Sequence, residues 1–87
     1  MKNLEFDANG FEDLAYWIET DRKTALRIVK LLREVQRTPF EGTGKPEALK
    51  NELAGCWSRR ITDEHRLVYE VKETKIRILA CRYHYKK

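Results

Sequence analysis

Three short strand-like runs follow one another in the second half of the chain, and they limit the possible folds more than any other feature. They span residues 56–61, 66–71 and 76–81, and four residues separate each run from the next. The second and third runs are rich in Val, Ile, Leu and Tyr, which favour strands. Connections this short join antiparallel neighbours, because a parallel pair needs a much longer crossover. The sequence therefore predicts an antiparallel meander of three strands.

The middle run alternates between the two faces of the predicted sheet. Leu67 and Tyr69 point to one face, and Arg66 points to the other. We expect helices to cover the apolar face, which leaves Arg66 on the open face. One of Arg59 and Arg60 in the preceding run must lie beside it, and the pattern alone does not decide which.

The first half of the chain predicts one strand and a pair of helices. Residues 2–7 alternate as in a short half-buried strand, and Asn9 is suited to cap the helix that follows. The apolar face of this first helix is predicted to comprise Phe11, Leu14, Ala15 and Ile18, with Trp17 at its edge. Asp21 and Pro39 bound a second helix, whose apolar stripe comprises Ala25, Ile28, Val29 and Leu32, thickened by Leu26, Leu31 and Val35.

A loop over residues 40–46 separates the helix pair from the meander. Pro46 is suited to open a short helix over residues 47–53, which would stop at Gly55. The predicted fold is α+β: a helix hairpin packed on a four-stranded, mainly antiparallel sheet, in the order strand, helix, helix, short helix and three strands. Residues 1–87 are expected to form a single domain.

The composition indicates a folded protein with a cationic surface. Charged residues make up 37% of the chain and the net charge is +4, which favours a polyanionic partner such as nucleic acid. No apolar run approaches the roughly 18 residues of a membrane span, and the N-terminus lacks a secretory signal, so we expect a cytoplasmic protein without a membrane partner. Cys56 and Cys81 are then expected to be reduced and to fill small spaces in the core.

Strand parity predicts that cations gather on the open face of the sheet. Because tyrosines and tryptophans accompany them, this surface would suit a single-stranded nucleic acid, whose phosphates pair with cations and whose bases stack on rings. Scattered arginines balanced by glutamates are the alternative. The candidate cations are Lys45, Lys50, Arg59 or Arg60, Arg66, and Arg77 or Arg82.

A nuclease reaction would need a base, an acid and a cation around one phosphate. Glu47 is the candidate base, His84 or Tyr85 the candidate acid, and Arg66 the cation for the phosphate oxygens. On the residues alone, Glu47 could equally be an ordinary acid in the first turn of a helix. His65 is interpreted as a turn residue. The cysteines and histidines lack the short spacing of a metal site, so neither a metal nor another cofactor is expected.

Several blocks of the chain resemble one known family. They are Arg37–Gly42, Gly44–Glu47, Gly55–Thr62, Glu64–Tyr69 and Cys81–Tyr85. In this order they resemble the YoeB (Txe/YoeB) toxins of bacterial type II toxin–antitoxin systems, which belong to the RelE superfamily. The resemblance implies a microbial-RNase-like fold and an endoribonuclease that cuts mRNA in the A site of the ribosome.

The resemblance also implies roles for individual residues. Glu47 would match the general base, Arg66 the arginine that stabilises the phosphate, His84 the general acid, and Tyr85 the tyrosine that orients the cleaved phosphate. The positions implied to bind rRNA or substrate phosphates are Lys45, Lys50, Arg59 and Arg60, and Arg82 is a further candidate from the charge pattern.

The implied partners are the bacterial ribosome with its mRNA, a YefM-like antitoxin that covers the basic surface, and a second copy of the chain. Operator DNA would be bound only through the complex with the antitoxin. Two alternatives remain at this stage. A toxin of the same fold could act on another target such as gyrase, and a non-catalytic module could bind RNA or antitoxin without cutting.

Overall fold

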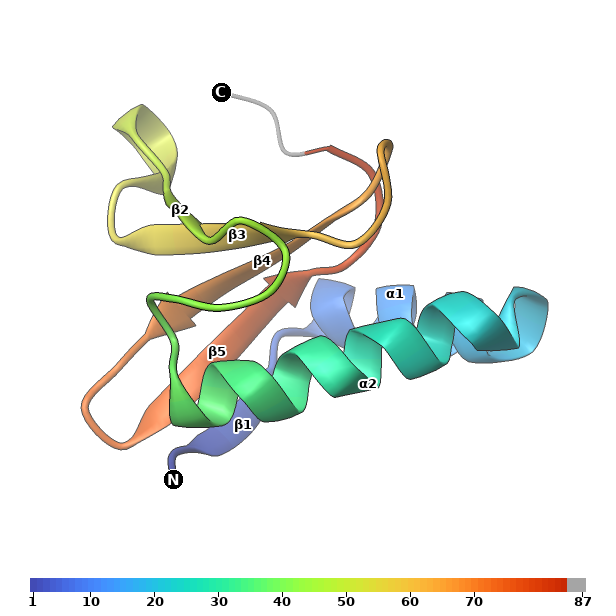
Figure 1. The fold of residues 1–87 in the computed structure, drawn as a ribbon, viewed down its shortest axis with the longest axis horizontal. Coiled ribbons are helices and arrows are strands. Elements are labelled where there is room, and N and C mark those ends of the chain that lie inside the picture. Colours follow the sequence, from blue (N-terminus) through green and yellow to red (C-terminus); the bar gives the residue numbers. More distant parts are fainter. Residues whose placement is uncertain (85–87) are drawn as a thin grey trace.

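The computed structural model describes residues 1–84 and comprises two helices against one sheet (Figure 1). Residues 85–87, which include the predicted site residue Tyr85, lie outside the described part of the chain. The elements are β1 (Asn3–Phe6), α1 (Ala8–Thr20), α2 (Arg22–Arg37), β2 (Glu47–Ala48), the 3₁₀ turn η1 (Asn51–Leu53), β3 (Cys56–Arg60), β4 (Arg66–Val71) and β5 (Lys75–Ala80).

The sheet has five strands in the order β1-β5-β4-β3-β2 and is mixed. The predicted meander is confirmed, since β3 and β5 both pair antiparallel with β4. The prediction of four strands was wrong. β1 runs parallel to β5, with Leu4 opposite Ile76. A parallel pair needs a long connection, and the helix pair and the other strands lie between β1 and β5 along the chain.

The fifth strand replaces the short helix that was predicted for residues 47–53. Glu47 and Ala48 pair with Ser58 and Trp57 of β3, and only a single 3₁₀ turn follows. A helix of seven residues gains few hydrogen bonds for the cost of its first turn. The edge of β3 instead offers backbone groups ready to pair, as in the bond from the N–H of Arg60 to the Gly44 carbonyl at 2.7 Å.

The main core lies between α2 and the face of the sheet that carries Leu67 and Tyr69, as predicted. Both side chains are completely buried, together with Ile76 and Ile78 of β5. The second helix begins as expected, because the Asp21 carboxylate accepts a hydrogen bond from the backbone N–H of Thr24. Its buried residues are Ala25, Ile28, Leu31, Leu32 and Val35, whereas Leu26 is exposed, against expectation.

The first helix is rotated relative to the prediction. It begins at Ala8, so Asn9 lies inside it and is not the cap. Trp17 is buried, whereas Phe11 and Ile18 are 57% and 61% exposed. The cause is a close approach at Gly10, where an added Cβ would collide with the backbone carbonyl of Ile78. This approach fixes which side of α1 faces the sheet.

The rotation of α1 predicts that a substitution at Trp17 lowers stability strongly, whereas one at its neighbour Ile18 barely changes it. Trp17 donates a buried hydrogen bond from Nε1 to the Cys81 carbonyl at 2.8 Å. Trp17→Phe leaves that carbonyl unpaired and is expected to lower the free energy of unfolding by about 1–3 kcal/mol. Ile18→Ala should change it by less than about 0.5 kcal/mol. Urea unfolding followed by circular dichroism measures both, and a larger effect at Ile18 would contradict the observed rotation.

Neither helix in the described part of the chain, residues 1–84, has the length and apolar character needed to cross a membrane.

Candidate active site

On the open face of the sheet, opposite the helices, residues that are paired between neighbouring strands form two rows across the sheet. Residues paired across neighbouring strands share a face. The pairs Glu47–Ser58, Ser58–Val68 and Val68–Ala80 form one row across β2, β3, β4 and β5. Arg60 pairs with Arg66 to form the adjacent row. Arg60 is therefore the arginine that shares the open face with Arg66, which the sequence alone left undecided.

Glu47 and Arg66 lie on the same face with two strand spacings between them. With about 4.8 Å between strands and about 3.3 Å per residue along them, their Cα atoms are about 12 Å apart. The Glu47 side chain is exposed, and Arg66 is half-buried. Two long side chains that start this far apart can reach opposite sides of one phosphodiester. The sheet thus carries a carboxylate and a guanidinium on the same face.

The end of the Arg66 side chain is held by the turn before β4. Its Nη1 donates to the carbonyl oxygens of Thr62 at 2.7 Å, Asp63 at 3.2 Å and His65 at 3.1 Å. Its backbone N–H donates to the Tyr83 carbonyl at 3.0 Å. One terminal nitrogen is therefore fixed by the protein, which limits the positions that the guanidinium can take.

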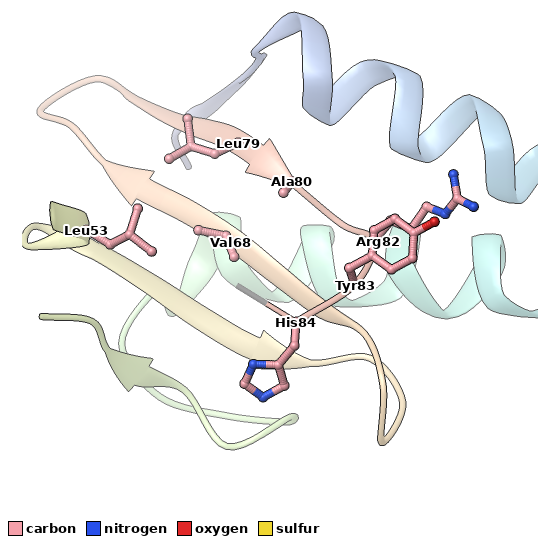
Figure 2. Close-up of a pocket in the computed structure, with 7 residues that line it drawn as sticks. All are labelled: Leu53, Val68, Leu79, Ala80, Arg82, Tyr83 and His84. Carbon is pink, nitrogen blue, oxygen red and sulfur yellow. The ribbon is translucent and has the colours of Figure 1, made fainter. Parts of the chain in front are cut away.

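His84 lies at a pocket of about 610 Å³ on the open face (Figure 2). Four apolar residues, Leu53, Val68, Leu79 and Ala80, line it together with Arg82, Tyr83 and His84. Val68 and Ala80 belong to the same row as Glu47. The exposed imidazole of His84 therefore joins Glu47, Arg60 and Arg66 on one side of the sheet.

Two expected cations of the open face have other partners. Arg82 lies with its guanidinium carbon 3.5 Å from the centre of the Tyr16 ring on α1, and 4.6 Å from that of Tyr83. Figure 2 shows Arg82 and His84 pointing in opposite directions. Arg77 forms ion pairs with Glu5, Asp7 and Glu70. Lys45 and Lys50 are exposed on the segment that contains β2.

The expected role of Arg59 in RNA binding does not fit its position, because its side chain is completely buried. It shares the core face with Leu67, its partner on β4. Its five N–H groups form five hydrogen bonds, so none remains for a phosphate. The acceptors are the Tyr69 hydroxyl, Glu34 Oε1 and the carbonyl oxygens of Thr38, Glu41 and Thr43. Arg59 thus holds the loop that leads into β2.

Glu34, which is half-buried, completes this cluster and makes the stability of the fold depend on pH in the acid range. Its carboxylate accepts from the backbone N–H of Thr43 at 2.5 Å and from Arg59 at 2.6 Å. The hydrogen bond from Thr43 and the nearby guanidinium of Arg59 hold the pKa of Glu34 below its ordinary value. A lowered folded-state pKa stabilises the fold above the unfolded-state pKa, and this contribution disappears as pH falls through the folded-state pKa.

We expect Glu34→Gln to reduce both the stability at neutral pH and its loss in acid. The neutral amide cannot take up the proton that the wild-type carboxylate takes up on unfolding below roughly pH 4.3. Urea midpoints measured from about pH 7 down to pH 3 should fall less steeply in the variant than in the wild type. An equal slope in the two proteins would contradict the assignment.

The two cysteines are buried and free, as predicted. Burial raises the pKa of the Cys56 thiol, and it raises that of Cys81 to about 12. Neither is therefore a thiolate at neutral pH, and both serve as small core residues.

His65 has a role that sequence reasoning missed. The sequence indicated a turn residue, but Nδ1 of His65 accepts a hydrogen bond from the backbone N–H of Tyr83 at 2.7 Å. Its ring also packs edge-on against Trp17, with the centroids 4.7 Å apart. Tyr83 and Trp17 are separated from His65 by 18 and 48 positions in the sequence, so no local pattern could have indicated these contacts.

The comparisons with known proteins agree with the fold. The family described as "YoeB-like toxin of bacterial type II toxin-antitoxin system" matches residues 6–85. Toxin YoeB of Escherichia coli (strain K12) is 52% identical over 94% of this chain and 98% of its own length. Toxin RelK of Mycobacterium tuberculosis is 53% identical over 98% of this chain and all of its own length.

A solved structure of similar sequence has the same fold. The YoeB dimer from Staphylococcus aureus superposes with a TM-score of 0.89 at 46% identity, covering 97% of this chain and 98% of that one. The same organism's YoeB–YefM complex gives 0.88 at 44% identity, covering 98% and 99%. With matches of this extent, the chain belongs to the YoeB family of toxins from bacterial type II toxin–antitoxin systems.

Proposed function

We propose that this protein is a ribosome-dependent endoribonuclease that cuts mRNA in the A site and thereby inhibits translation. The observation that carries the proposal is the common face shared by Glu47, Arg66 and His84, with Arg60 beside them. Membership of the YoeB toxin family supports it, because that resemblance implies RNA as the target.

In the proposed reaction, the RNA supplies its own nucleophile. Glu47 accepts the proton of a ribose 2′-hydroxyl, and the 2′-oxygen forms a bond to the adjacent phosphorus. The bond from phosphorus to the 5′-oxygen of the next nucleotide breaks, and that oxygen keeps the electron pair and takes a proton from His84. The products are a 2′,3′-cyclic phosphate, which water can open to a 3′-phosphate, and a 5′-hydroxyl. These two proton transfers require no metal ion.

The cations would serve the phosphate and the RNA backbone. Arg66 stabilises the negative charge that builds on the phosphate oxygens in the transition state. Tyr85, which lies outside the described residues, is proposed to orient the same phosphate. Arg60, Lys45 and Lys50 are proposed to contact phosphates of mRNA or rRNA. Their exposed side chains support this role, whereas the buried guanidinium of Arg59 has no access to RNA.

The proposed partners follow from the relatives. A solved S. aureus relative is a complex of YoeB with YefM, and another is a YoeB dimer. We propose that a YefM-like antitoxin neutralises this chain by covering its basic surface, and that the toxin forms a homodimer. Contact with operator DNA would be made through the antitoxin complex.

The proposal is tested by translating a reporter mRNA in a purified bacterial system and mapping breaks by primer extension. Wild-type protein should cut the mRNA when ribosomes translate it and should leave mRNA alone nearly intact. Added YefM-like antitoxin should suppress the cuts. Intact mRNA in the translating reaction would contradict the proposal. Inhibited supercoiling in a gyrase assay would favour a toxin with another target, and salt-sensitive RNA binding without cuts would favour a binding module.

A further inference from the structure

The chain bends at Arg82 and Tyr83, immediately before His84. Tyr83 has a φ of 65°, in the left-handed region that costs a residue with a side chain roughly 1–2 kcal/mol. Such a conformation persists only where the surrounding contacts determine it. The bend follows the end of β5, and His84 comes directly after it and lines the pocket on the open face.

Both backbone polar groups of Tyr83 are bound by residues at the start of β4. Its N–H donates to Nδ1 of His65 at 2.7 Å, and its carbonyl accepts from the backbone N–H of Arg66 at 3.0 Å. Tyr83 is 60% exposed, and its ring contacts only the surface: its centroid lies 5.8 Å from that of the His65 ring and 4.6 Å from the guanidinium carbon of Arg82. The two hydrogen bonds tie the backbone of Tyr83 to the segment that begins β4, and the ring contact with His65 adds to this hold.

His65 is itself held firmly. Its backbone carbonyl accepts from the N–H groups of Ile61 at 2.9 Å and Thr62 at 3.3 Å, and its own N–H donates to the Thr62 hydroxyl. Its half-buried ring packs edge-on against Trp17, whose Nε1 donates to the Cys81 carbonyl. The imidazole therefore meets the segment that leads to His84 from a fixed position.

We propose that His65 is a positioning residue that aims His84 at the phosphate by holding the left-handed turn at Tyr83. An imidazole that accepts at Nδ1 carries its single proton on Nε2. Protonation of both nitrogens, or loss of the ring, removes the acceptor. The claim rests on the proposed role of His84 as general acid, and it assigns His65 no contact with substrate.

The test compares His65→Leu with His65→Asn. Leucine fills similar space without an acceptor, whereas the Oδ1 of asparagine can take the place of Nδ1. In His65→Leu, hydrogen exchange at the Tyr83 amide should accelerate about tenfold, the equivalent of one hydrogen bond. The single-turnover rate of mRNA cleavage on the ribosome should fall about 10- to 100-fold, because a small misplacement of a reacting group has effects of this size. The ribosome concentration for half-saturation should stay within about threefold of wild type, since no binding contact is lost.

His65→Asn should restore both amide protection and cleavage to within about threefold of wild type, which a merely space-filling role would not predict. The ring tautomer in the wild-type protein provides a readout that does not depend on a variant's folding. Nitrogen NMR should show a proton on Nε2 and none on Nδ1.

Unchanged Tyr83 exchange in a folded His65→Leu variant, or a proton on Nδ1 in the wild type at neutral pH, would overturn the inference. So would cleavage by His65→Leu at the wild-type rate while wild-type protein cuts normally. A wild-type protein that cuts no mRNA would defeat the proposed function instead, while the exchange and tautomer results would still report on the turn.

Discussion

Replacing Arg59 by alanine is expected to lower the free energy of unfolding by about 3–5 kcal/mol, the usual effect of breaking a buried ion pair. The change removes one of the two donors to the Glu34 carboxylate and the guanidinium donors to three loop carbonyls. A domain of this size has only about 5–15 kcal/mol to lose, so the variant should lose a large fraction of its stability.

Arg60→Ala is the matched control, because it removes the same side chain one residue further along the same strand. Arg60 is exposed on the opposite face, so its loss should change stability by less than about 0.5 kcal/mol. It should instead weaken binding to ribosomes and flatten the dependence of binding on salt. Urea unfolding and salt titrations separate the two variants. Equal losses of stability at both positions would contradict the assignment of faces.

The second large effect is expected on the cleavage rate. Glu47→Gln and His84→Gln should each reduce single-turnover cleavage by about 10²- to 10⁴-fold, the usual contribution of a general base or acid. Arg66→Lys keeps the charge but loses the planar guanidinium, and a loss of about 10²- to 10³-fold is expected. Stability serves as the control. Glu47 and His84 are exposed, so their variants should unfold at nearly the wild-type urea concentration.

Combining the two glutamine substitutions separates a shared reaction from independent effects. Groups that act on one bond-breaking step are strongly non-additive, so the double variant should be little slower than the worse single variant. Wild-type rates in all three variants would show that Glu47 and His84 transfer no proton in the rate-limiting step.

The parts of the fold that the sequence predicted are those governed by local pattern. Four-residue connections and strand alternation were enough to predict the meander of β3, β4 and β5, and to put Leu67 on the core face. The Asp21 cap and Pro39 likewise bound α2 closely, because capping and proline geometry act within a few residues.

The errors arose where tertiary contacts outweighed local preference. Residues 47 and 48 form an edge strand because β3 offers them partners, and Glu47 consequently lies on the open face. The rotation of α1 depends on the approach of Gly10 to β5, which no helical periodicity reveals. Arg59 and Arg60 are identical in type and adjacent, so only the observed register could show that one is enclosed and the other exposed.

The roles of the site residues came from the family resemblance more than from the residue pattern. On the residues alone Glu47 could equally have been an acid in the first turn of a helix, and only the sheet register puts it on the same face as Arg60 and Arg66. Neither the resemblance nor the residue pattern indicated the role of His65, because its partner Tyr83 comes close only when the sheet is complete.

One substitution in the substrate distinguishes attack by the RNA's own 2′-hydroxyl, with Glu47 and His84 transferring protons, from any other reaction. An mRNA with a single 2′-deoxynucleotide immediately 5′ to a mapped cleavage site is presented on the ribosome to wild-type protein. We expect cleavage at this bond to disappear, while the unmodified mRNA is cut there and carries a 2′,3′-cyclic or 3′-phosphate end. Cleavage of the deoxy-substituted bond at the normal rate would contradict attack by the 2′-hydroxyl.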